Sequence, residues 1–208
     1  MILLLCAIKN RRFIINIMLT TKLYRYKEGK KIKGIGFPVI IDNINFHFTT
    51  IVVFADGLID CWGLMDFDEF KKKLRSGWIR INLPPNSKLH IYNFGIVSCT
   101  EFHPQKTNDD FIKEIEDCIL ELNGKESRRQ KCVRLFKSYL STNSKKFLRE
   151  LKVAFNDLPL DKRVLFDYAE EKDSLFILMK SERLFSVAER KSILSDYFEN
   201  EWDESEFK

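Results

Sequence analysis

The spacing of apolar residues changes halfway along the chain, and this change constrains the fold more than any other feature. Between residues 37 and 63 apolar side chains recur at every second position, which is the period of a half-buried β-strand. From about residue 108 onwards they recur every three or four positions, as on an amphipathic helix. The sequence therefore predicts an α+β protein. We expect an N-terminal antiparallel β-sheet of about five or six strands, with three hairpins and one short helix, and then a C-terminal bundle of four or five helices.

Three turns define the predicted hairpins: two-residue turns at residues 42–43 and 56–57, and a three-residue loop at 93–95. Asp-Gly, found at 56–57, strongly favours a hairpin. The predicted cross-strand pairs are Ile41–Ile44, Val39–Phe46, Phe37–Phe48, Phe54–Ile59, Val52–Cys61, Ile91–Val97 and Leu89–Cys99. Each register collects apolar side chains on one face. It also predicts that Cys61 and His47 lie on opposite faces of the sheet.

One helix is predicted within the β-rich half, and the remaining helices are predicted in the second half. Asp66 is a predicted N-cap, Phe67, Phe70 and Leu74 form one apolar stripe, and Gly77 ends the helix. Further helices are predicted near residues 107–124, 127–140, 145–158, 161–172 and 181–200. We expect a β-rich domain at 18–104 and an α-helical domain at 105–208.

The first 17 residues are interpreted as an N-terminal extension. Alternatively, translation starts at Met18, and these residues are not part of the protein. Their apolar stretch, residues 1–8, is too short for a signal peptide and for the about 20 apolar residues of a membrane span. The five cysteines include no C-x-x-C pair, which favours free thiols in a reducing compartment. We therefore expect a cytoplasmic protein with no membrane partner.

Charge is distributed unevenly. Residues 1–104 carry 15 Lys and Arg against 8 Asp and Glu, whereas residues 105–208 carry 20 against 22, with an acidic C-terminal end. The basic excess centres on residues 22–33, whose candidate contact residues are Lys22, Tyr24, Arg25, Tyr26, Lys30 and Lys31. Cations interleaved with aromatic rings are typical of single-stranded nucleic-acid binders. A solvated edge strand has the same pattern, so both interpretations stay open.

Candidate catalytic groups are few. Cys61 is flanked by Asp60 and Trp62, and His47 is expected on the neighbouring strand, so an enzyme site would involve these residues together with His90. The predicted register separates Cys61 from His47, which favours a buried structural cysteine. The three histidines are predicted to be scattered, so no metal site and no cofactor are expected.

One segment resembles a known family. The stretches Gly57-Leu-Ile-Asp-Cys-Trp-Gly63, Asp66-Phe-Asp-Glu-Phe and Ser76-Gly-Trp-Ile79 are similar to those of a bacterial domain family of unknown function, over about residues 36–102. This resemblance implies no activity and no site residue. The residues themselves are explained by a hairpin turn, an aromatic sheet face and a helix boundary.

These observations favour a non-enzymatic protein-interaction module, in a toxin-immunity or defence setting. We expect its aromatic sheet face, with Trp62 and Trp78, and its acidic C-terminal end to bind another protein. The alternatives are a nucleic-acid-binding protein that uses the basic segment 22–33, and an enzyme with a site near Cys61, His47 and Asp60.

Overall fold

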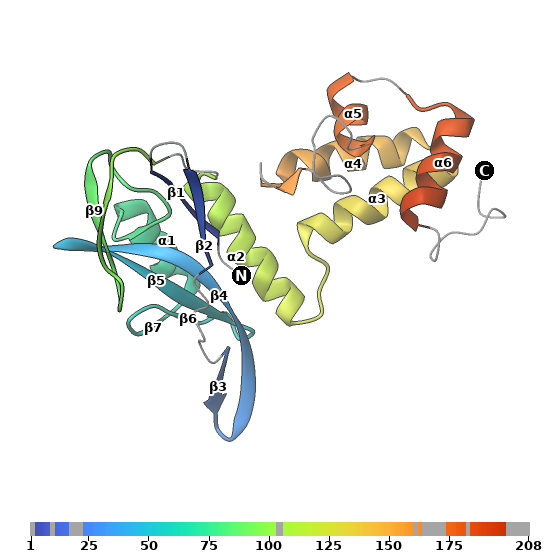
Figure 1. Cartoon of the computed structure of the whole chain (residues 1–208). Helices are drawn as coiled ribbons and strands as arrows, with labels where there is room; N and C mark the ends of the chain where they lie inside the picture. The colour runs from blue at the N-terminus through green and yellow to red at the C-terminus, as the bar shows by residue number, and fades with distance from the viewer. Residues whose placement is uncertain are drawn as a thin grey trace. The chain divides into compact units, whose positions relative to one another are not determined.

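The computed structural model describes residues 3–8, 11–16, 23–102, 106–159, 162–163, 174–181 and 184–198. The chain divides into two compact units, Met1–Asn108 and Asp109–Lys208. Strands dominate the first, here called the sheet unit, and helices make up the second, the helical unit (Figure 1). The predicted α+β fold is confirmed.

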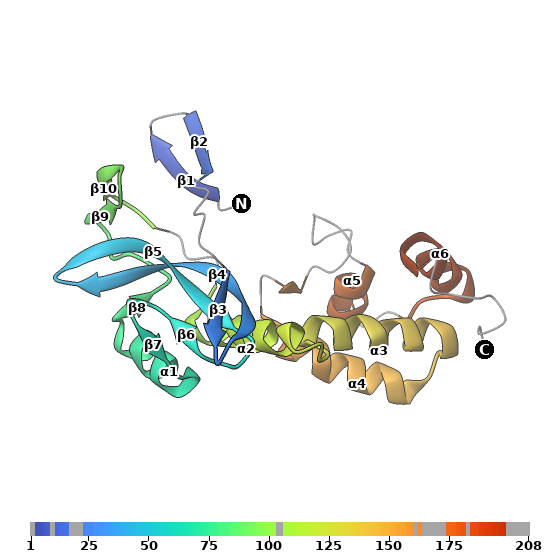
Figure 2. The ribbon, with the colours of Figure 1, turned by 90° about the horizontal axis from the view of Figure 1, so that it is seen from below.

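A long antiparallel ribbon of two strands organises the sheet unit. β4 (Lys30–Asn43) pairs with β5 (Asn45–Phe54) from Gly34 opposite Phe54 to Asn43 opposite Asn45. The other strands attach to this ribbon directly or through one neighbour: β3 (Tyr24–Lys27) and β8 (Ile79–Arg80) on β4, β6 (Ile59–Asp60) and β9 (Ser87–Ile91) on β5, β7 (Leu64–Met65) on β6, and β10 (Gly95–Cys99) on β9. Figure 2 shows the ribbon with α1 (Phe67–Ser76) on one side.

One strand pairing differs from the prediction. β9 joins β5 in parallel, so the sheet is mixed rather than wholly antiparallel. Residues interpreted as an extension contain β1 (Leu3–Ile8) and β2 (Arg11–Asn16), which form a separate two-stranded sheet.

The predicted register of the first hairpin is wrong. Val39 pairs with Thr49 rather than with Phe46, because the chain reverses at Ile44 and not at residues 42–43. Ile44 has a φ of 63°, an unusual left-handed conformation for a β-branched residue. Its side chain is 98% exposed, so the backbone of this turn, rather than apolar burial, sets the register.

The second and third hairpins are also shifted. Ile59 pairs with Val53 and not with Phe54, because Gly57, at φ 83°, closes a three-residue turn by donating its N–H to the Phe54 carbonyl at 2.9 Å. A type I turn followed by a left-handed glycine has this form. In the third hairpin Val97 pairs with Leu89. That shift of two residues keeps the predicted apolar set on one face, whereas odd shifts exchange the faces.

Each face of the ribbon buries apolar side chains. On one face Ile41, Ile51, Val53, Ile59 and Ile79 are fully buried. On the other, Ile40, Leu83, Leu89 and Ile91 form a second cluster.

Helix α1 lies next to β8 and begins and ends as predicted. Asp66 Oδ1 accepts the backbone N–H of Glu69 at 2.8 Å, and Gly77 follows the helix with a φ of 81°. Phe70 and Leu74 are buried. The predicted cap, stripe and end of this helix are confirmed.

The helical unit contains α2 (Asn108–Leu122), α3 (Arg128–Thr142), α4 (Lys145–Asp157), α5 (Ser174–Ser181) and α6 (Val187–Phe198), with the first residue of α2 at the unit boundary. Its core includes buried residues from α3 to α6. The sequence does not predict α5, which is only eight residues long. The predicted helix at 161–172 lies almost wholly outside the described residues. Within the described part, the helices are too short or too polar to cross a membrane.

The observed β4–β5 register predicts that a methyl group at position 34 is destabilising. A Cβ built on Gly34 lies 2.8 Å from both Phe54 Cδ1 and Val52 Cγ1. We expect Gly34→Ala to lower the free energy of unfolding by about 1–3 kcal/mol, measured by urea denaturation. Gly36→Ala meets its nearest atom, Thr50 Cγ2, at 3.0 Å and should cost less. Unchanged stability of Gly34→Ala would contradict the register.

Candidate interaction surface

A strained turn presents Trp62 to solvent. The turn joins β6 to β7: the Cys61 N–H donates to the Gly63 carbonyl at 3.0 Å, and the Gly63 N–H donates to Asp60 Oδ1 at 3.3 Å. Trp62 has a φ of 57°, which costs a residue with a Cβ about 1–2 kcal/mol. The residue is nevertheless 56% exposed. Backbone strain of this kind concentrates at functional sites, so it marks this turn as a candidate.

Two further rings lie beside Trp62, and a third lies beside one of those two. Its ring centroid is 5.6 Å from that of His47 and 6.2 Å from that of Trp78, both in edge-on geometry. His47 is in turn 5.3 Å from His90. We call His47, Trp62, Trp78 and His90 the aromatic face.

The aromatic face depends on the parallel pairing of β5 with β9, which places His47 directly opposite His90. The prediction that the histidines are scattered is therefore wrong for this pair. His103 lies outside the described residues. No group of three or more potential metal ligands occurs in the part of the chain that the structure describes.

A cation borders the aromatic face. Lys73 Nζ, on α1, lies 4.5 Å from the centroid of the Trp78 ring and 3.1 Å from Glu69 Oε1. Glu69 and Lys73 lie four residues apart on α1, so this ion pair forms along one face of the helix. The ammonium group covers one face of the Trp78 ring, and Trp62 is the most exposed ring of the aromatic face.

The same side of the sheet continues onto β10. Ile96 pairs with His90, and cross-strand partners share a face. Ile96 is 60% exposed, and Phe94 and Tyr92 at the adjoining loop are also exposed. Within the described residues β10 ends the strand order of the main sheet. We call β10, with its exposed Ile96 and the exposed Phe94 just before it, the β10 edge.

The candidate catalytic residues do not form a nucleophilic site. Cys61 is 3% exposed, and burial raises the pKa of its thiol to about 12, against the smaller opposing effect of the Lys73 charge. A nucleophilic cysteine needs the opposite shift. Asp60 is used in the turn at Gly63, and no hydrogen bond joins Cys61 to His47 in the described structure.

The register predicted for the second hairpin, which separated Cys61 from His47, is wrong. His47, Ile51 and Val53 lie on the same face of β5, because an even number of positions separates them. Val53 pairs with Ile59, so Ile59 lies on the face of His47 as well. The one-residue shift of the second hairpin accounts for the error. Burial of the thiol, rather than its face, argues against a Cys-His pair.

The basic segment forms the β3–β4 hairpin. Arg25 makes an ion pair with Asp56 and lies 5.3 Å from the Phe54 ring, so it has a structural role. Lys31 lies 4.0 Å above the Tyr24 ring. Tyr26, 65% exposed, and Lys30 face solvent, whereas Lys22 lies outside the described residues.

The fold and this surface together define an α+β domain with an exposed aromatic face. The chain belongs to the family described as a domain of unknown function (DUF7638), whose model matches residues 22–126. The match extends beyond the predicted 36–102 at both ends and includes α2. Comparisons with curated proteins and with solved structures find no match.

The cysteine environments predict an order of thiol reactivity. Cys61 and Cys118 are buried with thiol pKa values of about 12, whereas Cys99 is only half-buried. At about pH 8 a thiol with such a pKa is about one part in 10⁴ thiolate, so alkylation should be slow. We expect iodoacetamide to modify Cys99 before Cys61 and Cys118, as measured by peptide mass spectrometry. The denatured chain is the control. Labelling of Cys61 before Cys99 would contradict its burial.

Proposed function

We propose that the sheet unit is a protein-interaction module that binds an extended segment of a partner protein. In this proposal the segment pairs with β10 as an additional strand, and its side chains contact the aromatic face. Strand addition takes affinity from backbone hydrogen bonds and specificity from side chains at alternate positions. The partner segment would therefore carry apolar residues at every second position.

The strained conformation of Trp62 carries this proposal. Gly or Asn at φ 57° would remove most of the conformational cost, whereas Trp keeps it. Ring contacts with His47 and Trp78 return about 0.5–1.5 kcal/mol each, but more than half of the residue's surface stays exposed. Binding is a physical reason to hold an exposed indole there, because Trp is prominent among interface hot spots.

The position of Ile96 connects the aromatic face to the edge. Ile96, His90 and His47 form a row across β10, β9 and β5. A strand added beside β10 would place alternate side chains next to Ile96, on the side of the sheet that carries the two histidines. Exposed apolar edge strands otherwise favour aggregation, and the charges that commonly protect such edges are missing from β10 itself.

Binding of defined peptides tests the proposal. A short peptide that alternates Val and Thr should bind the full chain more tightly than a peptide of the same composition in scrambled order, as measured by fluorescence anisotropy. We expect Ile96→Lys and Trp62→Gly each to weaken binding by about tenfold or more. Ile44→Lys is the matched control, because Ile44 is 98% exposed on a different turn of the same unit.

Three results would overturn this function. They are equal affinity for the alternating and scrambled peptides, unchanged binding by both Ile96→Lys and Trp62→Gly, and equal weakening by Ile44→Lys. Circular dichroism of each variant confirms that the sheet unit is folded, so that loss of binding is not loss of structure.

A second candidate function rests on the β3–β4 hairpin. Tyr24 and Tyr26 lie opposite Lys33 and Lys31, so two rings and two cations share one face. This arrangement favours single-stranded nucleic acid.

For this second function, affinity for a short single-stranded oligonucleotide should fall as salt rises, since phosphate contacts release counterions. Lys31→Glu should weaken binding several-fold, whereas Lys88→Glu, the same charge change on β9, should not. The measurement is an anisotropy titration at several salt concentrations. Salt-independent binding would contradict a nucleic-acid role.

A further inference from the structure

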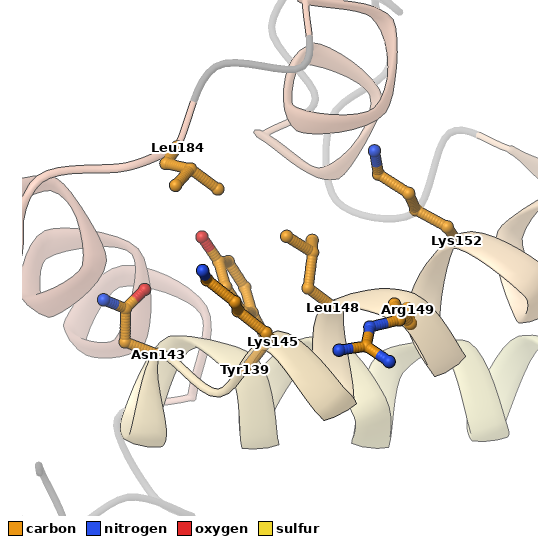
Figure 3. A pocket seen from close by; sticks show the side chains of 7 residues that line it. All are labelled: Tyr139, Asn143, Lys145, Leu148, Arg149, Lys152 and Leu184. Atoms are coloured by element: carbon orange, nitrogen blue, oxygen red, sulfur yellow. The ribbon is translucent and has the colours of Figure 1, made fainter.

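A pocket in the helical unit combines a buried hydroxyl with cationic and apolar walls. Its volume is about 300 Å³, and Tyr139, Asn143, Lys145, Leu148, Arg149, Lys152 and Leu184 line it (Figure 3). An engineered cavity of about 150 Å³ holds benzene, so this pocket has room for a small molecule with one ring and a head group. It lies wholly within the helical unit.

Helix α4 supplies one wall through its spacing. Lys145, Leu148, Arg149 and Lys152 recur at three- and four-residue intervals, which places them on one face of the helix. Tyr139 belongs to α3, and Asn143, at φ 51°, ends that helix by donating its N–H to the Tyr139 carbonyl at 2.8 Å. The short α3–α4 connection therefore brings the tyrosine ring next to the cations of α4.

The hydroxyl of Tyr139 needs a partner. The residue is 1% exposed, and its hydroxyl oxygen is buried without a hydrogen bond of normal length and angle in the described structure. A buried polar group left in this state destabilises the fold, and such groups are normally explained by a bound water, ion or ligand. Figure 3 shows the hydroxyl directed from α3 towards the space near Leu184.

The electrostatics of the pocket favour an anion. Neither Lys145 nor Arg149 forms an ion pair with a described residue, and both are exposed. Burial raises the pKa of Tyr139, against the smaller opposing effects of the Arg190 charge and the Phe185 backbone. The phenol therefore keeps its proton at neutral pH and can donate a hydrogen bond. Lys145 also stands at the N-terminus of α4, where the helix dipole favours negative charge.

We propose that this pocket binds a small organic anion whose oxyanion head group, carboxylate or phosphate, contacts Lys145, Arg149 and the Tyr139 hydroxyl, and whose apolar body packs against Leu148 and Leu184. The hydroxyl oxygen is buried, so the exposed side chain of Lys145 or Leu184 moves aside as the head group enters. The ligand gains charge-assisted hydrogen bonds. Its apolar body replaces water at two leucines.

Four probes separate the parts of this ligand: 3-phenylpropionate, phenyl phosphate, inorganic phosphate and the neutral 3-phenylpropanol. Calorimetric titration of the full chain should give measurable binding of at least one phenyl anion. Inorganic phosphate and the alcohol should bind at least about tenfold more weakly, because each lacks one half of the recognition. The preferred phenyl anion identifies the head group as carboxylate or phosphate.

Substitutions test the assigned contacts. Tyr139→Phe deletes only a hydroxyl that makes no hydrogen bond of normal length and angle, so the variant should fold with unchanged or higher stability while binding falls about tenfold. Lys145→Ala and Arg149→Ala should each weaken binding several-fold. Lys146→Ala is the matched control: Lys146 is exposed on the same helix and does not line the pocket.

Several outcomes would overturn the assignment. Wild-type affinity in both Tyr139→Phe and Lys145→Ala would exclude the proposed contacts, and equal weakening by Lys146→Ala would reduce them to general surface charge. Equal binding of the alcohol would leave an apolar pocket only, and equal binding of inorganic phosphate would leave an ionic contact only. These results do not bear on the peptide-binding function of the sheet unit, which has its own probes.

Discussion

The pairing of β4 with β5 is the constraint on which the rest of the sheet unit depends. Four other strands attach directly to these two, while β7 attaches through β6 and β10 attaches through β9. The hairpin reverses at Ile44, and this position decides that Ile41 and Ile51 are buried while His47 continues the same face towards solvent. A shift of one residue would exchange those side chains with the opposite face.

Local signals in the sequence predict the elements well and their registers poorly. Asp66 and Gly77 locate α1 because capping is a short-range interaction. The strand registers depend on backbone conformations at Ile44 and Gly57. The first hairpin reverses at Ile44 alone, and a three-residue turn that ends at Gly57 closes the second, so neither has the predicted two-residue turn. The parallel pairing that brings His47 to His90 joins segments about forty residues apart, and no local pattern encodes it. For this reason Trp62 and Trp78 can be predicted as candidates, but the aromatic face that they form with the histidines cannot.

The two units carry different kinds of surface. In the sheet unit the strained Trp62 and the exposed Ile96 offer rings and an open backbone edge, which suit an extended protein segment. In the helical unit Lys145 and Arg149 line the same pocket as Tyr139, whose hydroxyl is buried, and this combination suits a small anion. The proposed protein segment and small anion would bind to separate surfaces, and Cys61, protonated and buried, contributes to packing in the sheet unit.

Hydrogen exchange at the two ends of the strand order β10-β9-β5-β4-β3 tests the central proposal most directly. β10 ends the strand order on one side and β3 ends it on the other, so each serves as a control for the other. Exchange is followed by NMR on the full chain, with and without the alternating Val and Thr peptide. We expect slower exchange at amides within Gly95–Cys99 and no change within Tyr24–Lys27. Protection of β3 instead of β10, or of neither strand, would contradict strand addition beside the aromatic face.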